Sequence, residues 1–288
     1  MFGASSDIGR RAAARLLDSG LAVRLISRSA AGLDPRAQHY EGDVSGALDA
    51  VHDADVVISC AHASFTMQIL GALETRTPKM VLVGSAWRYS GVYEARGHEV
   101  VAAEAAFLGS GRNGVMLHPT MIYGGTQENN LHRLIDAIHR WPVLPIPGGG
   151  SNLVQPIHVD DVAQSIAAAV TKDWKGPHAL PICGPMPMRW RYMLDTCVNA
   201  LGYRRVVFPV PLRPAIAALQ LLQRTGVMPP IDPNILLRFQ EDVSFSTEPM
   251  NTHLGIYPRD FESGLSQFLS SYIPFSRGES GKRIVSGT

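Results

Sequence analysis

Short apolar runs alternate with amphipathic segments along the first half of this chain, and this alternation limits the possible folds more than any other feature. Unbroken apolar runs are typical of parallel strands whose sheet is covered on both faces. The runs of strand length are Leu21–Ile26, Asp55–Ser59, Met80–Val83 and Val115–Leu117. Helical periodicity fills the intervals at Asp7–Ser19, Ala63–Leu73 and His98–Leu108. Repeated strand–helix units predict an α/β fold with a doubly wound parallel sheet.

The turn Gly3–Gly9 (GASSDIG) stands directly before the first predicted helix. Glycine lets the backbone approach a diphosphate closely, and the helix N-terminus offers free N–H groups and the positive end of its dipole. The usual middle glycine is missing, because the turn is filled by Ser5, Ser6, Asp7 and Ile8. The turn therefore predicts a dinucleotide site, with a simple helix N-cap at Ser5 or Ser6 as the alternative.

Only Met1 and Phe2 precede this turn. A glycine turn of this kind usually follows a strand of about five residues, and that strand is central in a doubly wound sheet. We therefore expect the first strand to begin upstream of residue 1, with a strand reduced to a short stub as the alternative.

Arg28 follows the second predicted strand, in the segment Ser27-Arg28-Ser29. Proteins that bind NAD usually place an acid here to bond the ribose 2′-hydroxyl, whereas an arginine accommodates the 2′-phosphate of NADP. Arg10 lies close enough in sequence to assist. The segment therefore favours NADP(H) as the cofactor, with NAD(H) as the alternative.

The chain after Pro119 is less regular. Helical patterns recur at Asn129–Arg140, Asp160–Val170, Arg189–Leu201 and Pro214–Gln223, with a strand-like run at Val154–Val159 and a turn-rich loop at Pro145–Gly150. We predict a Rossmann core made mainly of residues 1–150, then a returning strand and helix with a smaller C-terminal substrate lobe over 151–275. Residues 276–288 are polar and are expected to form a disordered tail. The Pro145–Gly150 loop and the segment from Pro209 to Pro230 are expected to border the substrate cleft.

The bulk composition argues against several classes of function. The net charge of +1 gives no field that would attract nucleic acid. No apolar run reaches the roughly 18 to 20 residues that a membrane span needs. The three cysteines form no pair with zinc-ligand spacing, so we expect reduced thiols, no metal site and a cytoplasmic protein. Association with a membrane surface or a protein complex stays open.

Two later segments carry the most specific patterns. His118-Pro119-Thr120-Met121-Ile122-Tyr123-Gly124 resembles the Arg-Pro-x-x-x-Tyr-Gly turn of the extended and atypical short-chain dehydrogenase/reductase superfamily, and residues 155–163 resemble its His-Val-x-Asp-Val-Ala segment. This group contains the NAD(P)-dependent sugar-nucleotide epimerases and dehydratases, and the resemblance runs from Gly3 to about Leu269. It implies contacts with the cofactor for Asp43 and Val44 at the adenine, Cys60 and Ala61 along its length, and His118, Pro119 and Thr120 near the nicotinamide.

The same resemblance implies a catalytic serine and a Tyr-x-x-x-Lys pair, whose lysine lowers the tyrosine pKa. Ser85 matches the serine, and Tyr93 is the candidate tyrosine. The lysine position, counted back from Glu104, falls on Val100, and no lysine occurs between Lys79 and Lys172. Two explanations stay open. Either Tyr93 still acts, with its pKa tuned by Arg96 or His98, or the proton-transfer groups are gone and only the nucleotide site persists.

A looser likeness links the C-terminal region to the nucleotide-binding accessory subunit of respiratory complex I, through residues 154–156 and 208–212. Those relatives also lack the catalytic pair. Two nearby polar residues have structural interpretations: His158 is expected to be a core histidine with its hydrogen bonds satisfied, and Asp160 to cap the following helix.

The leading interpretation is an NADP(H)-binding atypical short-chain dehydrogenase that acts as a reductase, dehydrogenase or epimerase. Its expected substrate is small and polar, or linked to a nucleotide. The alternative is a nucleotide-binding structural, assembly or redox-sensing protein without turnover.

Overall fold

The computed structural model describes residues 1–73, 77–91, 95–127, 129–214 and 240–272, with positions 216–217, 221, 237, 276–277 and 283–284. At residues 48–49 and 95–96 only the backbone is described. Of the predicted helix at Pro214–Gln223 the structure describes positions 214, 216–217 and 221, and the segment from there to Pro230 lies outside the described residues. In the predicted disordered tail, β13 (Ser276–Arg277) and β14 (Arg283–Ile284) pair antiparallel.

A parallel sheet forms the centre of the protein, as the apolar runs predict. Four strands are adjacent in the order β10 (Pro177–Ile182), β5 (Gly114–Pro119), β4 (Lys79–Val83) and β3 (Val56–Ser59). A further pair is β1 (Arg24–Ser27) and β2 (Gln38–Glu41). Phe2 joins the two groups through parallel bridges to Ile26 and Ser59. The resulting order is β10-β5-β4-β3-Phe2-β1-β2. All these strands are parallel, and the chain adds strands first on one side of Phe2 and then on the other, as in a doubly wound Rossmann sheet.

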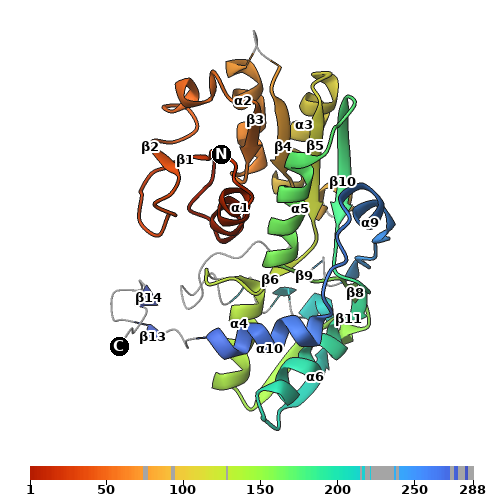
Figure 1. Ribbon diagram of the computed structural model, residues 1–288. Helices are drawn as coiled ribbons and strands as arrows, with labels where there is room; N and C mark the ends of the chain where they lie inside the picture. The colour runs from red at the N-terminus through yellow and green to blue at the C-terminus, as the bar shows by residue number, and fades with distance from the viewer. Residues whose placement is uncertain are drawn as a thin grey trace.

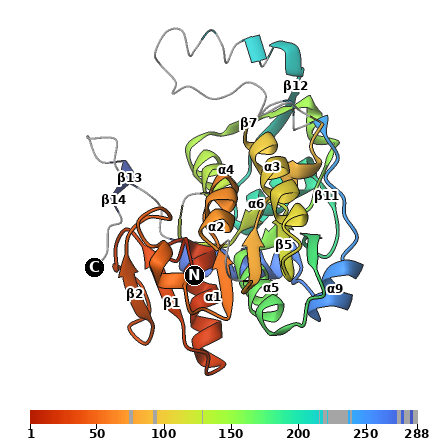
Figure 2. The same ribbon diagram turned by 90° about the horizontal axis from the view of Figure 1, so that it is seen from above.

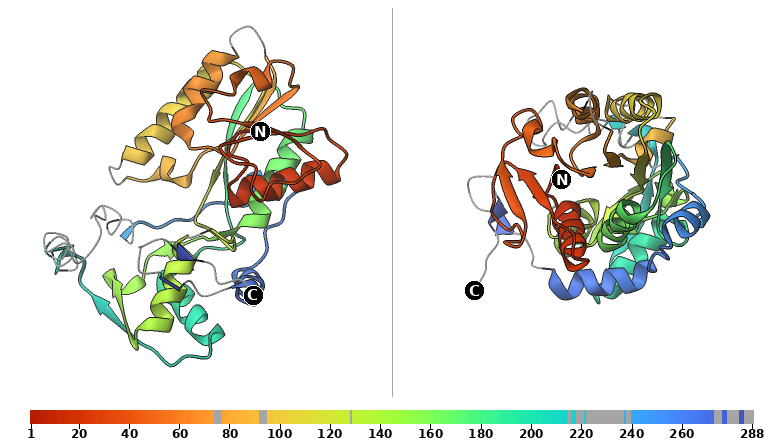
Figure 3. Two further views of the ribbon diagram at one scale, coloured as in Figure 1. Left: turned by 90° about the vertical axis from the view of Figure 1, so that its left-hand side faces the viewer. Right: turned by 45° about the horizontal axis from the view of Figure 1, so that its top comes forward.

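Helices cover both faces of this sheet (Figures 1 and 2). On one face α1 (Asp7–Asp18) packs beside α5 (Val159–Thr171), and α9 (Glu248–Leu254) packs on α5 and β10. On the other face α2 (Thr66–Ala72) packs against α3 (Ala95–Gly109). The left view of Figure 3 shows the sheet between these two layers. Single turns of 3-10 helix, η1 (Leu48–Val51) and η2 (Ala63–Phe65), join this second layer to the strands.

A smaller lobe lies beyond the carboxyl edge of the sheet (Figure 1). Its own apolar core is formed by α4 (Asn130–Arg140), β7 (Val143–Pro147), α6 (Trp190–Ala200) and α10 (Phe261–Ser271). β12 (Val206–Val210) pairs parallel with β7. Two short pairs lie between lobe and sheet: β6 (Ile122–Tyr123) with β9 (Ile157–His158), and β8 (Leu153–Val154) with β11 (Met188–Arg189).

Charged side chains tie the lobe to the helices of the sheet. The guanidinium of Arg259, just before α10, donates to the Asp161 carboxylate near the start of α5 at 2.9 and 3.0 Å. Asp161 is almost completely buried, at 2% exposed. Neighbouring Asp160 pairs with Arg11 of α1. A buried carboxylate is stable only with such partners, so these pairs fix α1, α5 and α10 against one another.

The structure corrects two local expectations. His158, rather than Asp160, caps α5: its Nδ1 accepts a hydrogen bond from the Asp160 N–H at 3.2 Å. The loop predicted over Pro145–Gly150 is in its first part the end of β7, and only Gly148–Gly150 forms a turn, η4. The prolines of this segment argue against a strand, because proline has no N–H to donate to a neighbouring strand. An edge position in a two-stranded sheet tolerates them.

Candidate functional site

The glycine turn lies where the strand order reverses, between β1 and β3. Gly3 has a left-handed φ of +68°, and a Cβ atom built on it would lie 2.6 Å from the Cys60 carbonyl carbon and the Ala61 nitrogen. A Cβ atom on Gly9 would overlap the Gly3 carbonyl oxygen. Ser6 caps α1, because its Oγ accepts from the Gly9 N–H at 3.0 Å and donates to the Gly3 carbonyl oxygen at 2.8 Å. The cap expected as an alternative is therefore present, in a turn that has no room for a side chain at Gly3 or Gly9.

Asp7 links this turn to the loop that follows β6. Its carboxylate accepts from the Gln127 N–H at 2.6 Å, from Thr126 Oγ1 at 2.7 Å and from the Arg10 guanidinium at 2.9 Å. Partial burial disfavours the charged carboxylate, but the hydrogen bonds, led by that from Gln127, leave the pKa of Asp7 below its ordinary value. A Cβ atom on Gly125 would overlap this carboxylate. Asp7 thus fixes the loop after β6 to the start of α1, and its place in the turn did not predict this role.

The other residues predicted to contact a cofactor follow the strands on either side of the turn. Arg28 is exposed directly after β1, and the Arg10 side chain lies against Gly32 in the same loop. Asp43 is exposed after β2, where its carboxylate accepts from the Gly46 N–H at 2.8 Å, while Val44 is buried. Cys60 and Ala61 follow β3 and pack on Gly3. The predicted set is therefore brought to one edge, at the carboxyl ends of the strands, where open α/β sheets bind their ligands.

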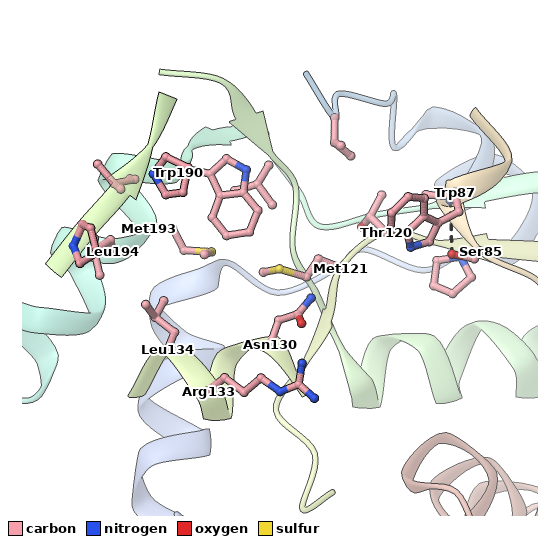
Figure 4. Close-up of a pocket in the computed structure, with 17 residues that line it drawn as sticks. Ser85, Trp87, Thr120, Met121, Asn130, Arg133, Leu134, Trp190, Met193 and Leu194 are labelled. Carbon is pink, nitrogen blue, oxygen red and sulfur yellow. Dashed lines mark hydrogen bonds between the residues drawn. The ribbon is translucent and has the colours of Figure 1, made fainter. Parts of the chain in front are cut away.

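A cleft of about 410 Å³ opens between this edge and the smaller lobe. Figure 4 shows Ser85 and Thr120 close together at one end, with Trp190 and Met193 across the cleft. Ser85 caps the short turn η3 (Ala86–Tyr89) after β4, and Thr120 follows β5. Thr120 is 6% exposed, and its Oγ1 has no hydrogen-bond partner among the residues that the structure describes. An unpaired buried hydroxyl is costly, so Thr120 is ready to bond a ligand.

His118 lies buried beneath Ser85 and organises this end of the cleft. Its Nδ1 accepts from the Ser85 N–H at 3.3 Å, and its Nε2 lies 2.7 Å from the carboxylate of Glu104 on α3. Glu104 also accepts from Arg88 Nε at 2.9 Å. Burial lowers the pKa of His118, although Glu104 opposes that shift. A neutral ring with its proton on Nε2 satisfies both contacts. A Cβ atom on Gly84 would lie 2.6 Å from His118 Nδ1, so the ring also fixes the backbone that carries Ser85.

The expected proton-transfer residues are placed only in part. Tyr93 lies outside the described residues, and of Arg96 only the backbone is described. His98 is exposed on the first turns of α3, and this helix packs on η3. Val100, at the position counted for the lysine, is 3% exposed in the core between the sheet and α3. No role of Glu104 is predicted from the sequence; the signal for one is a histidine in an apolar strand, since a buried polar side chain needs a partner.

Solved structures with the same architecture carry NAD or nucleotide sugars. The UDP-glucuronic acid 4-epimerase from Bacillus cereus, in complex with UDP-glucuronic acid and NAD, is 17% identical; the match covers 94% of this chain and 98% of that one with a TM-score of 0.70. The dTDP-glucose 4,6-dehydratase from Bacillus anthracis, in complex with NAD, is 16% identical, with 93% and 94% covered and a TM-score of 0.71. The chain has the fold of the NAD-dependent epimerases and dehydratases.

This epimerase/dehydratase fold confirms the α/β architecture expected from the sequence. A third structure with it is the UDP-glucose 4-epimerase from Thermotoga maritima with UDP-glucose, at 15% identity, a TM-score of 0.68, and 93% and 96% covered. No known protein-family model matches the chain. A curated relative, the uncharacterized protein y4nG of Sinorhizobium fredii, is 23% identical over 184 residues. That match covers 64% of this chain and 46% of y4nG, so the chain spans about half the length of this relative.

No helix among the described residues combines the length and apolarity needed to cross a membrane. Within the same described part of the chain, no group of three or more His, Cys, Asp or Glu side chains could hold a metal ion.

Proposed function

We propose that the protein is an NADP(H)-dependent oxidoreductase with the epimerase/dehydratase fold, acting on a carbonyl or hydroxyl group of a small substrate bound in the cleft. One observation carries the proposal. The glycine turn that would approach a diphosphate and the Ser85–Thr120 end of the cleft lie along the same carboxyl edge of the sheet. A dinucleotide laid along this edge would reach from Asp43 to Thr120, and the neighbours that bind NAD support a nicotinamide cofactor.

The residues at the edge fit such a cofactor. A Cβ atom on Gly3 or Gly9 would collide with neighbouring backbone, so the two glycines let the turn pack closely against the end of β3 and the start of α1. The start of α1 is where free N–H groups could bind a diphosphate. Arg28 and Arg10 flank the loop where an adenosine 2′-phosphate would lie, and a guanidinium suits a phosphate because it donates in a bidentate manner. NADP(H) is therefore favoured over NAD(H).

Each residue at the cleft has a defined part in the proposed chemistry. A bound nicotinamide supplies hydride exchange with a substrate carbon. Ser85 and Thr120 donate hydrogen bonds to the substrate oxygen and hold it in place. The proton exchange with that oxygen is assigned to Tyr93 from the sequence alone, because Tyr93 lies outside the described residues. His118 and Glu104 act as positioning residues, because they hold the backbone N–H of Ser85 rather than the substrate.

The test compares the two reduced cofactors. NADPH and NADH are titrated into the parent protein, Arg28→Ala and Arg36→Ala, with nucleotide fluorescence as the readout. Arg36 is a matched control because it lies in the same region and pairs with Asp34 and Asp18 on the surface. We expect NADPH to bind at least tenfold more tightly than NADH in the parent protein. Arg28→Ala should reduce this ratio of affinities about tenfold or more. Arg36→Ala should leave it unchanged.

Equal affinities in the parent would refute the NADP assignment, and no binding of either cofactor would refute the proposed function. One observation favours a second candidate, a nucleotide-binding protein without turnover: Val100 packs into the core where a lysine would be needed. Tight NADPH binding without NADPH oxidation, over a broad panel of carbonyl compounds and sugar nucleotides, would establish that candidate.

A further inference from the structure

We infer that the cleft takes a neutral substrate in which an apolar ring system carries the reacting oxygen, rather than a second nucleotide. The chemistry at that oxygen rests on the proposed function. Binding of the ring does not, because it depends only on the walls of the cleft.

Aromatic and thioether side chains form much of the walls, and the polar side chains of Asn130 and Arg133 line the α4 side. Trp87 lies on the side of the sheet, Trp190 and Met193 project from α6, and Met121 lies between them (Figure 4). Tryptophan offers a large flat surface that stacks on rings, and methionine adapts to irregular apolar shapes. A sugar presents hydroxyl groups on every side, and these walls would leave most of them without partners.

The charge of the walls also argues against a nucleoside diphosphate. Among the lining residues that the structure describes, Arg133 is the one ionisable side chain. A diphosphate carries two negative charges and is usually held by several cationic groups or by a helix N-terminus. Two of the N–H groups at the N-terminus of α4 beside the cleft are already used, since Asn129 Oδ1 accepts from the N–H groups of Leu131 at 2.9 Å and His132 at 3.2 Å.

One end of the cleft nevertheless requires a polar atom. Thr120 Oγ1 is buried and unpaired within the described structure, and Ser85 lies beside it. A ring with a single carbonyl or hydroxyl oxygen fits both parts of the cleft. Its oxygen would bond Thr120 at the polar end, and its apolar body would contact Trp190 across the cleft. The geometry therefore selects for one oxygen at one end of an apolar molecule.

The experiment measures binding by calorimetry, both with the protein alone and with NADP⁺ added in excess. The probes are 2-naphthaldehyde, naphthalene as its counterpart without oxygen, and UDP-glucose. We expect 2-naphthaldehyde to bind at least tenfold more tightly than UDP-glucose. Trp190→Ala should weaken it about tenfold or more, and Trp141→Ala, an exposed tryptophan of the same lobe, should not. Thr120→Val, which keeps the shape without the hydroxyl, should weaken 2-naphthaldehyde several-fold and leave naphthalene unchanged.

Each outcome decides the inference separately from the proposed function. Tighter binding of UDP-glucose than of 2-naphthaldehyde overturns the inference and leaves the proposed oxidoreductase intact, as does equal loss in Trp190→Ala and Trp141→Ala. Selective ring binding without any NADPH oxidation supports the inference while counting against turnover. If Trp190→Ala does not fold, Leu134→Gln on the α4 wall takes its place, with the same loss of ring binding expected.

Discussion

Two glycines of the turn Gly3–Gly9 and one beyond the end of α1 separate backbone strain from steric overlap, and alanine substitution at each gives a quantitative test. Gly20 has a φ of +79°, and a Cβ atom placed on it would have no other atom within 4 Å, so Gly20→Ala meets strain alone. At Gly9 the φ is not in the left-handed region, so Gly9→Ala meets overlap alone, with the Gly3 carbonyl. Gly3→Ala meets both, at a φ of +68° and 2.6 Å from the backbone of Cys60 and Ala61.

The expected losses in the free energy of unfolding follow from these contacts. A left-handed conformation costs alanine about 1–2 kcal/mol, of which roughly 0.4–1 is recovered from the stiffer unfolded chain. Gly20→Ala should therefore lose about 1 kcal/mol. Overlap in a packed region costs about 1–3 kcal/mol, and more when the neighbour is backbone that cannot move aside. Gly9→Ala should lose about 2 kcal/mol after the gain in helix propensity, and Gly3→Ala about 3–5 kcal/mol.

Urea unfolding followed by circular dichroism gives these free energies, and NADPH titration of the folded variants gives a second readout. Gly3→Ala and Gly9→Ala should also weaken NADPH binding at least tenfold, whereas Gly20→Ala, at the far end of α1, should not. The reasoning is wrong if Gly3→Ala is no more destabilising than Gly20→Ala, or if all three variants bind NADPH as the parent does.

The remaining predictions concern proton transfer and acid stability. Tyr93→Phe and Ser85→Ala should each reduce any measured turnover by roughly 10²–10⁴-fold while NADPH affinity stays nearly unchanged; an intact steady-state rate in Tyr93→Phe would remove Tyr93 from the mechanism. Burial is the main reason that the pKa of His158 is lowered to about 4. Arg259 and Arg11 contribute to this shift, while Asp160 and Asp161 oppose it. The unfolded histidine titrates near 6.5, so its stabilisation is complete above that pH and is lost as the pH falls towards 4, by about 3 kcal/mol. His158→Asn keeps a capping side chain but should lack this slope in unfolding experiments at pH 7 to 4, and an unchanged slope would assign it to other groups.

The sheet centre could be predicted from sequence because its strands are buried on both faces. Asp55–Ser59 and Met80–Val83 are unbroken apolar runs, and they become β3 and β4. β2 and β10 were not found, because they are outer strands among those described. Polar residues are tolerated in β2, and prolines at both Pro177 and Pro181 in β10.

The glycine turn and the cleft also differ in how far the sequence predicts them. The glycine turn is local, so its residues and their spacing indicate the chemistry without knowledge of the fold. The cleft joins residues as distant in sequence as Ser85 and Trp190. The contact of His118 with Glu104 joins β5 to α3, the helix that covers one face of the sheet. Only the folded arrangement brings these side chains together, and no periodicity in the sequence predicts such pairs.

The ion pairs of Arg259 with Asp161 and of Arg11 with Asp160 have a consequence for how this protein can diversify. The polypeptide passes back and forth between sheet and lobe, so exchanging the lobe with that of a relative would need several junctions. In a chimera with α5 from one parent and residues 259–267 from another, the buried Asp161 carboxylate could lose its arginine partner. Recombination at a single point is therefore expected to yield few folded products, and new substrate ranges should arise more readily by point substitution in the walls of the cleft.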